Sequence, residues 1–87
     1  MAARITVDAV IGHIHMGRYH LVGPALQGGA VDANDQDGDG GTVLHMAAYK
    51  GHAPTIAMAL QAGANPNARD RYGETPLWCL ARRGEVR

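Results

Sequence analysis

A pattern that recurs after 33 residues constrains this chain more than any other feature. The stretch DGDGGTVLHMAAYKGH begins at Asp37, and DRYGETPLWCLARRGE begins at Asp70. Six pairs are identical in this frame: Asp37/Asp70, Gly40/Gly73, Thr42/Thr75, Leu44/Leu77, Ala48/Ala81 and Gly51/Gly84. A fixed period of this length is typical of repeat architectures, in which a unit buries its apolar face only by stacking on its neighbours.

A third, weaker copy lies upstream at a spacing of 34. Its matching residues are Gly17, Leu26, Gln27, Gly29 and Ala30, which correspond to Gly51, Leu60, Gln61, Gly63 and Ala64. The extra residue is Val31, which we expect in a connecting loop. We therefore interpret residues 1–87 as one domain with units at approximately 4–36, 37–69 and 70–87.

Each unit carries the signals of a short helix that begins after a threonine. Thr42 and Thr75 precede apolar residues at helical spacing, and a threonine at this place can cap the free amides of a helix. We expect these helices to end near Gly51 and Gly84, because glycine readily adopts the left-handed conformation that closes a helix.

A second helix and a polar loop follow in the middle unit. The segment PTIAMALQAG predicts a helix that begins at Pro54 and stops at Gly63, with Ile56, Ala59 and Leu60 facing inward. The next segment, ANPNARDRYGE, is rich in Asn, Asp and Gly and favours a β-turn. In the first unit, Gly23-Pro24 delays the second helix to about Gly23.

Charge and composition argue against several classes of function. The formal net charge is zero and no basic run occurs, which disfavours a nucleic-acid partner. The first fifteen residues are too short and too polar for a secretory signal or a membrane span. The single cysteine, Cys79, excludes an internal disulfide and suits a reducing compartment. We expect a cytoplasmic protein that does not contact membranes.

The repeated residues resemble the ankyrin repeat. That family's signature is D-x-x-G-x-T-P-L-H-x-A-A-x-x-G-H, then a second helix and G-A-x-x-N-A-x-D, and it appears here as DGDGGTVLHMAAYKGH and GANPNARD. Val43 replaces the signature proline, while the third unit has Trp78 in place of the histidine and Leu80 in place of a small alanine. The first unit is degenerate, and the last has only its first helix, so the resemblance covers about two and a third repeats.

The resemblance implies an all-α solenoid of stacked helix-turn-helix units with β-turn loops. It also implies a non-catalytic scaffold for protein–protein interaction, with no cofactor, that contacts partners through its β-turn tips and inner helices. Because Tyr and Arg often anchor interfaces, Tyr72, Arg71, Tyr49 and Arg82 are the first candidates. The full set of partner-binding candidates is Tyr72, Arg71, Glu74, Asp39, Tyr49, Lys50, Arg82, Arg83 and Trp78. The alternative is a structural fragment or subunit that self-associates or completes a larger solenoid.

Two metal-binding hypotheses are weak. Asp35, Asp37 and Asp39 mimic the start of a calcium loop, but Met46 stands where a bidentate glutamate is required. No pair of the five histidines has the i, i+4 spacing of a helical zinc site. The resemblance assigns His45 and His52 structural hydrogen bonds instead, so we expect no metal site.

Three residues near the end of the chain have competing interpretations. The repeat register places Cys79 inside, which argues against a nucleophile. Arg82 and Arg83 either offset a helix dipole or recognise an acidic partner. Trp78 either packs on Leu60 and Met58 or belongs to an uncovered apolar end face that could mediate self-association.

Overall fold

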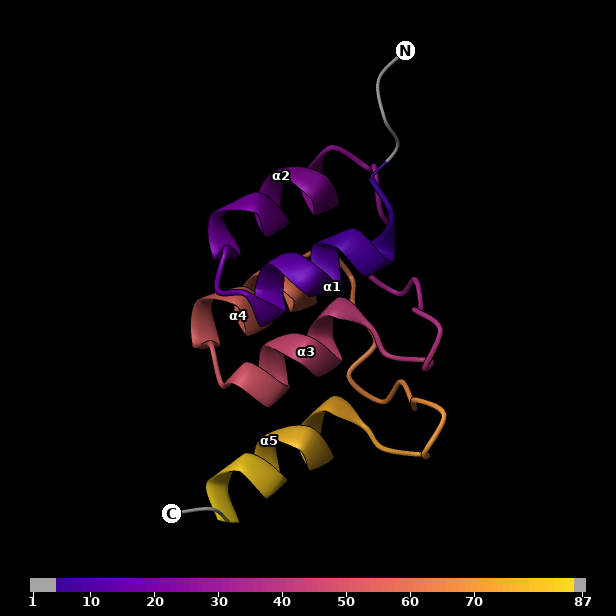
Figure 1. Ribbon diagram of the computed structural model, residues 1–87, viewed down its shortest axis with the longest axis vertical. Helices are drawn as coiled ribbons and strands as arrows, with labels where there is room; N and C mark the ends of the chain where they lie inside the picture. The colour runs from indigo at the N-terminus through magenta and orange to yellow at the C-terminus, as the bar shows by residue number, and fades with distance from the viewer. Residues whose placement is uncertain (1–4, 86–87) are drawn as a thin grey trace.

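The computed structural model describes residues 5–85, and within this range all regular structure is helical. The helices are α1 (Val7–His15), α2 (Val22–Gln27), α3 (Val43–Lys50), α4 (Ala53–Gln61) and α5 (Pro76–Glu85), with a 3-10 turn at Tyr19–Leu21 before α2. Helices α1 and α2 form the first unit, α3 and α4 the second, and α5 the third, and the three units stack in chain order (Figure 1). The all-α ankyrin-like solenoid predicted from the sequence is confirmed. The outermost residues of the predicted units, Arg4 and Arg87, lie outside the described residues.

Threonine caps explain where three of the helices begin. Thr42 Oγ1 accepts a hydrogen bond from the His45 amide at 3.3 Å, and Thr75 Oγ1 accepts one from the Trp78 amide at 3.2 Å. Both predicted helix starts are thereby confirmed. Thr6 caps α1 in the same way through the Ala9 amide, a cap that the repeat comparison had not indicated in the first unit.

The helix ends predicted near Gly51 and Gly84 lie close to the observed ends. α3 ends at Gly51, whose φ of 67° is the left-handed conformation expected of a closing glycine. α5 continues through Gly84 to Glu85, one residue beyond the predicted end near Gly84. The second helix of the first unit begins at Val22, one residue before the predicted position.

The hydrophobic core lies between the first two units. Val10, Ile14, Val22 and Val43 are fully buried there, and α3 contributes Leu44 at 2% exposed. α5 packs on α3 and adds one further layer, visible at the C-terminal end of the stack in Figure 1. The first helix of the second unit is therefore enclosed by helices on both sides.

Two predictions about the second helix of the middle unit need correction. Leu60 does not face inward, since 44% of it is exposed, whereas Ala59 is buried as predicted. Met58 does not lie on the C-terminal face either, because its sulfur packs against Gly23 of α2. α4 therefore directs its methionine toward the first unit.

Residues 5–85 carry neither a membrane-spanning helix nor a metal-binding cluster. No helix there is both long and apolar enough to cross a membrane. No group of three or more His, Cys, Asp or Glu side chains in residues 5–85 is arranged to hold a metal ion.

Candidate partner-binding groove

Two loops of identical construction project beside α3 and α5, and we call them the fingers (residues 37–41 and 70–74). In the first, Asp37 Oδ1 accepts hydrogen bonds from the amides of Asp39 and Gly41, both at 2.9 Å. In the second, Asp70 Oδ1 accepts bonds from Tyr72 and Glu74, also at 2.9 Å. These carboxylates shape the turns, as aspartate commonly does. The segment whose sequence mimics the start of a calcium loop is therefore a turn, in which the Asp37 carboxylate accepts hydrogen bonds from backbone amides.

The fingers are also joined to each other. The Arg71 amide donates to the Asp39 carbonyl at 2.8 Å, and the Arg71 guanidinium pairs with the Asp39 carboxylate at 2.8 Å. Gly40 permits this approach: its φ is 77°, and a Cβ there would lie 2.9 Å from the Arg71 nitrogen. Arg71 thus has a structural contact between units that the sequence had not indicated.

His45 ties the second unit to the third from inside. The Thr42 amide donates to His45 Nδ1 at 3.2 Å, so Nδ1 is the unprotonated nitrogen of a neutral ring. Nε2 then carries the proton and donates to the Glu74 carbonyl at 2.8 Å. His45 is 6% exposed, and its bond to the Glu74 carbonyl confirms the structural role expected for this histidine. His52 also has structural contacts, a 2.7 Å bond to Thr55 and a stacked ring of Tyr19.

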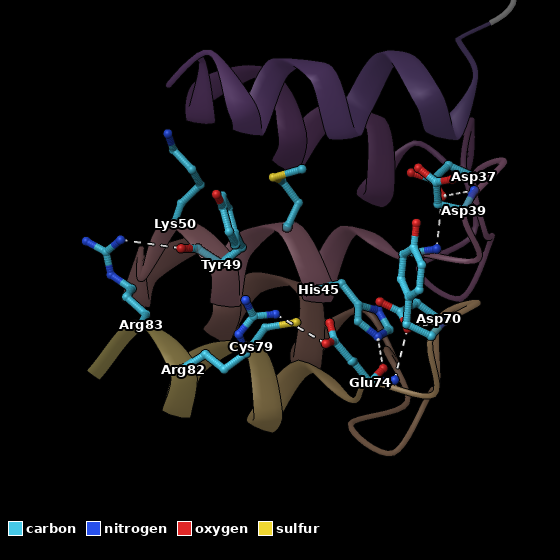
Figure 2. A pocket seen from close by; sticks show the side chains of 13 residues that line it. Asp37, Asp39, His45, Tyr49, Lys50, Asp70, Glu74, Cys79, Arg82 and Arg83 are labelled. Carbon is cyan, nitrogen blue, oxygen red and sulfur yellow. Dashed lines mark hydrogen bonds and ion pairs between the residues drawn. The ribbon is translucent and has the colours of Figure 1, made fainter. Parts of the chain in front are cut away.

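A groove of about 780 Å³ runs between the fingers and the inner helices. Figure 2 shows the finger residues at one end and the last turns of α3 and α5 at the other. Its lining comes from the fingers (Asp37, Asp39, Gly41, Asp70, Tyr72, Glu74), from α3 (His45, Met46, Tyr49, Lys50) and from α5 (Cys79, Arg82, Arg83).

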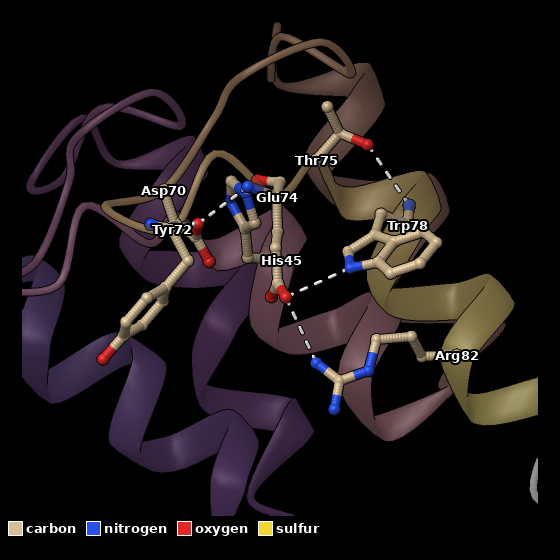
Figure 3. Close-up of polar contacts among 7 residues, drawn as sticks. All are labelled: His45, Asp70, Tyr72, Glu74, Thr75, Trp78 and Arg82. Carbon is tan, nitrogen blue, oxygen red and sulfur yellow. Dashed lines mark hydrogen bonds and ion pairs between the residues drawn. The ribbon is translucent and has the colours of Figure 1, made fainter.

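Glu74 holds a small polar cluster where the second finger enters α5 (Figure 3). Its carboxylate Oε2 accepts a bond from Trp78 Nε1 at 3.1 Å and pairs with Arg82 at 3.2 Å. Trp78 is 47% exposed, so it neither packs fully on the preceding unit nor stands free. Glu74 therefore positions α5 residues, a duty that the sequence had not suggested for a turn-tip residue.

The opposite end of the groove is basic. Arg83 donates to the Tyr49 carbonyl at 3.3 Å and lies over Gly51, so that it crosses from α5 to the end of α3. Lys50 occupies the last turn of α3 nearby. Because α3 and α5 are repeats of one element and run side by side, their positively charged C-terminal turns lie together.

Cys79 lines the middle of the groove and is only partly buried, which corrects its predicted interior position. Burial raises the pKa of its thiol above the usual 9.0, and the carboxylates of Glu74 and Asp70 raise the pKa further, against a smaller opposite effect of Arg82. A raised pKa keeps the sulfur protonated at neutral pH, which is the reverse of what an activated nucleophile requires.

Comparison with known proteins decides the family. The model of the family described as "Ankyrin repeats (many copies)" matches residues 26–77. The chain belongs to the ankyrin-repeat family. It is 46% identical over 54 residues to the human Neurogenic locus notch homolog protein 4. The aligned region covers 62% of this chain and 3% of that protein.

Two further relatives extend the match. The Transient receptor potential cation channel subfamily A member 1 homolog of Caenorhabditis elegans is 35% identical over 79 residues, 86% of this chain and 6% of that protein. Protein phosphatase 1 regulatory subunit 12A of Mus musculus is 44% identical over 46 residues, 53% of this chain and 4% of that protein. Ankyrin repeats generally mediate protein–protein interaction. The chain spans only a small part of each of these relatives.

Most of the predicted partner-binding residues of this ankyrin domain lie on one groove. Seven of them line it: Tyr72, Glu74, Asp39, Tyr49, Lys50, Arg82 and Arg83. Arg71 lies beside it in the finger-to-finger pair, and Trp78 lies outside it. The predicted set did not include six other lining residues, namely Asp37, Gly41, His45, Asp70, Met46 and Cys79. The last two of these, Met46 and Cys79, share one repeat position. Their spacing of three and four residues from Tyr49–Lys50 and Arg82–Arg83 places them on the same helix faces and could have revealed them.

Proposed function

We propose that this ankyrin-repeat chain is a non-catalytic module that binds a protein partner through its fingers and the inner helices α3 and α5. The observation that carries the proposal is the position of two tyrosines. Tyr72 on the second finger is 72% exposed and Tyr49 on α3 is 60% exposed, and both line the same groove. Neither phenol takes part in a hydrogen bond or ion pair within the described residues.

Exposed tyrosines on a rigid base suit an interface. A tyrosine offers a large apolar ring and a polar tip and has few side-chain torsions to immobilise. The backbone beneath them is fixed by the paired Asp37 and Asp70 turns and by the bond from His45 to Glu74. Preorganisation of this kind lowers the entropic cost of association. We expect the module to act in the cytoplasm, where the free Cys79 stays reduced.

Affinity capture followed by mass spectrometry tests the proposal when it is run with matched variants. Tyr72→Ala should weaken a captured partner by about 1–3 kcal/mol while the thermal melt of the chain changes little. Leu77→Ala is the control, because Leu77 is equally exposed but lies on the end face of α5, outside the groove. A partner that is lost with Leu77→Ala and kept with Tyr72→Ala would place the interface elsewhere and contradict the proposal.

A second candidate function rests on the apolar end face formed by α4 and α5. Leu60, Leu77 and Leu80 are 44%, 70% and 40% exposed there. Leu44 and Ala47, the counterparts of Leu77 and Leu80 in the second unit, are 2% and 0% exposed, and Leu26, the counterpart of Leu60 in the first unit, is 8% exposed. A further ankyrin unit is therefore the natural occupant of the end face, supplied by a second copy of the chain or by a larger solenoid.

Analytical ultracentrifugation over a dilution series separates these possibilities. Self-association should appear at micromolar concentrations, should be lost in a Leu77→Gln, Leu80→Gln double variant, and should survive Tyr72→Ala. A chain that stays monomeric throughout would argue against the second copy and leave the groove as the interaction surface.

A further inference from the structure

The groove between the fingers and the inner helices has two ends of opposite charge. Asp37 and Asp70 lie at the finger end, and Lys50 and Arg83 lie at the end formed by the last turns of α3 and α5, as Figure 2 shows. The chain as a whole has no net charge, so this separation is a local property of the groove. It follows from the repeat itself, because equivalent residues of successive units stack at the same end.

The other charged groups in and beside the groove largely cancel. Asp39 pairs with Arg71 at 2.8 Å, and Glu74 pairs with Arg82 at 3.2 Å. Within residues 5–85, these are the ion pairs that the structure contains. Two carboxylates therefore remain at one end of the groove and two cations at the other.

These remaining charges are available to a ligand. Asp37 and Asp70 each use one oxygen, Oδ1, to hold the amides of their own turns. Arg83 donates to a backbone carbonyl, which leaves its positive charge uncompensated. Lys50 suits the negative end of the α3 dipole, but that partial charge is smaller than the full charge of the ammonium.

Between the charged ends lies a less polar middle. Met46 of α3 and Cys79 of α5 line it, and both are partly buried. The Cys79 thiol and the Met46 thioether are weak hydrogen-bonding groups, so this stretch of the groove favours an apolar side chain.

Helix geometry gives the distance between the charged ends. The eight residues of α3 separate the fingers from Lys50, which is about 12 Å at 1.5 Å per residue. An extended chain covers that length in about four residues. A helical ligand would need about twice as many.

We propose that the groove binds an extended segment of a protein partner that carries one basic and one acidic residue about four positions apart, with an apolar residue between them. The basic side chain lies beside Asp37 and Asp70, and the acidic side chain lies beside Lys50 and Arg83. This inference rests on the proposed function and specifies the chemistry of the partner. A polyanion such as nucleic acid would instead place phosphates beside two carboxylates.

Selection from a displayed library of random linear peptides tests the proposal on the full chain. We expect the selected peptides to share a Lys or Arg and an Asp or Glu at a fixed separation, and their binding to weaken as salt concentration rises. The Lys50→Gln, Arg83→Gln double variant should bind them about threefold to tenfold more weakly, as expected for partly exposed ion pairs. Arg18→Gln, at an exposed cation outside the groove, should leave binding unchanged.

A double-mutant cycle identifies which charges meet. Replacing the acidic residue of a selected peptide by Gln should weaken binding to the native chain but not to the Lys50→Gln, Arg83→Gln variant. Asp37→Asn with Asp70→Asn should couple in the same way to the basic residue of the peptide. Asparagine retains the Oδ1 acceptor that shapes each finger, so the thermal melt checks that the fold is intact.

The outcomes separate this inference from the proposed function. Peptides that bind through Tyr72 without a shared charge pattern, or with additive effects in the cycle, would overturn the bipolar ligand and leave the interaction module in place. Peptides whose charges are spaced for a helix would overturn the extended conformation. A folded chain that selects no peptide above background would count against both proposals.

Discussion

α3 and α5 occupy the same place in successive repeats and begin with the same threonine cap, yet they differ in how much of their apolar surface is covered. Leu44 of α3 is 2% exposed, whereas its counterpart Leu77 on α5 is 70% exposed. Ala47 is fully buried, whereas Leu80 at the same repeat position is 40% exposed. The caps are local and therefore match, while the burial depends on neighbours and therefore differs.

This difference teaches that one pattern can serve two energetic roles. Helix α3 contacts α1, α4 and α5, so its leucine contributes to the core of the stack. Helix α5 packs mainly on α3, so the same residue type contributes little there. In repeat proteins the energy of a unit is largely the energy of its interfaces.

Truncating the two equivalent leucines should give the largest contrast. Leu44→Ala should cost about 2–5 kcal/mol of the free energy of unfolding, because it leaves a cavity in a closely packed layer. Leu77→Ala should cost no more than about 0.5 kcal/mol, as for an exposed surface residue. Urea denaturation of both variants checks this. Similar losses would mean that the end face of α5 is covered in solution.

The equivalent residues His45 and Trp78 should give a smaller contrast. His45→Ala leaves the Thr42 amide and the Glu74 carbonyl without their ring partner, which should cost about 1–3 kcal/mol. Trp78→Phe removes one exposed bond to Glu74 and should cost well below 1 kcal/mol. Amide hydrogen exchange should rise throughout α5 in the histidine variant alone. Unchanged exchange there would show that His45 does not join the second and third units.

Sequence predicted the parts of this structure that depend on near neighbours. Thr42 and Thr75 marked the helix starts correctly because a cap acts over three residues. The end of α5 was predicted to within one residue, but Gly84 lies inside the helix, which runs to Glu85. Gly51, the equivalent glycine in the second unit, has a left-handed backbone and closes α3.

The candidate groove could be predicted only in outline. The resemblance to the ankyrin family indicated Tyr49, Lys50 and Tyr72 as partner-facing residues, and all three line the groove. The bonds from Arg71 to Asp39 and from His45 to Glu74 join residues about thirty positions apart. Periodicity says that units stack, but the pairing of individual side chains depends on how the fingers approach each other, which no single unit encodes.

The asparagines of successive loops should give a smaller difference still. Asn34 bridges two units: its side chain donates to the Gly63 carbonyl at 3.0 Å and accepts from the Asn65 amide at 2.6 Å. Asn67, its counterpart 33 residues later, is exposed and bonds to Asn65 through its own backbone amide. Asn34→Ala should cost about 0.5–1.5 kcal/mol, and Asn67→Ala less than about 0.5 kcal/mol. Thermal melts of the two variants test this, and an equal loss would contradict the bridging role of Asn34.

The smallest expected effect is on the pH dependence of the free energy of unfolding. It distinguishes Cys79 of α5 from Met46, which occupies the equivalent position on α3. The pKa of the Cys79 thiol is raised in the folded chain, first by burial and then by Glu74 and Asp70. As pH rises above the usual value of 9.0, the unfolded chain releases this proton before the folded chain does. Unfolding is thereby favoured, so the contribution of Cys79 lowers stability with increasing pH in that range.

The variant Cys79→Met, which introduces the residue found at the equivalent position of α3, isolates the contribution of the Cys79 thiol to the pH dependence of stability. Tyrosine and lysine side chains also titrate at high pH, but they do so equally in the native chain and in Cys79→Met. The free energy of unfolding, measured by urea denaturation on both sides of pH 9.0, should therefore fall more steeply with pH in the native chain.

At neutral pH, the thiol should also react more slowly with a disulfide reagent in the folded chain than in urea, because less thiolate is present. A folded-state reaction as fast as that of the unfolded chain would show that the middle of the groove is more open and more polar than its lining by Met46 and Cys79 implies.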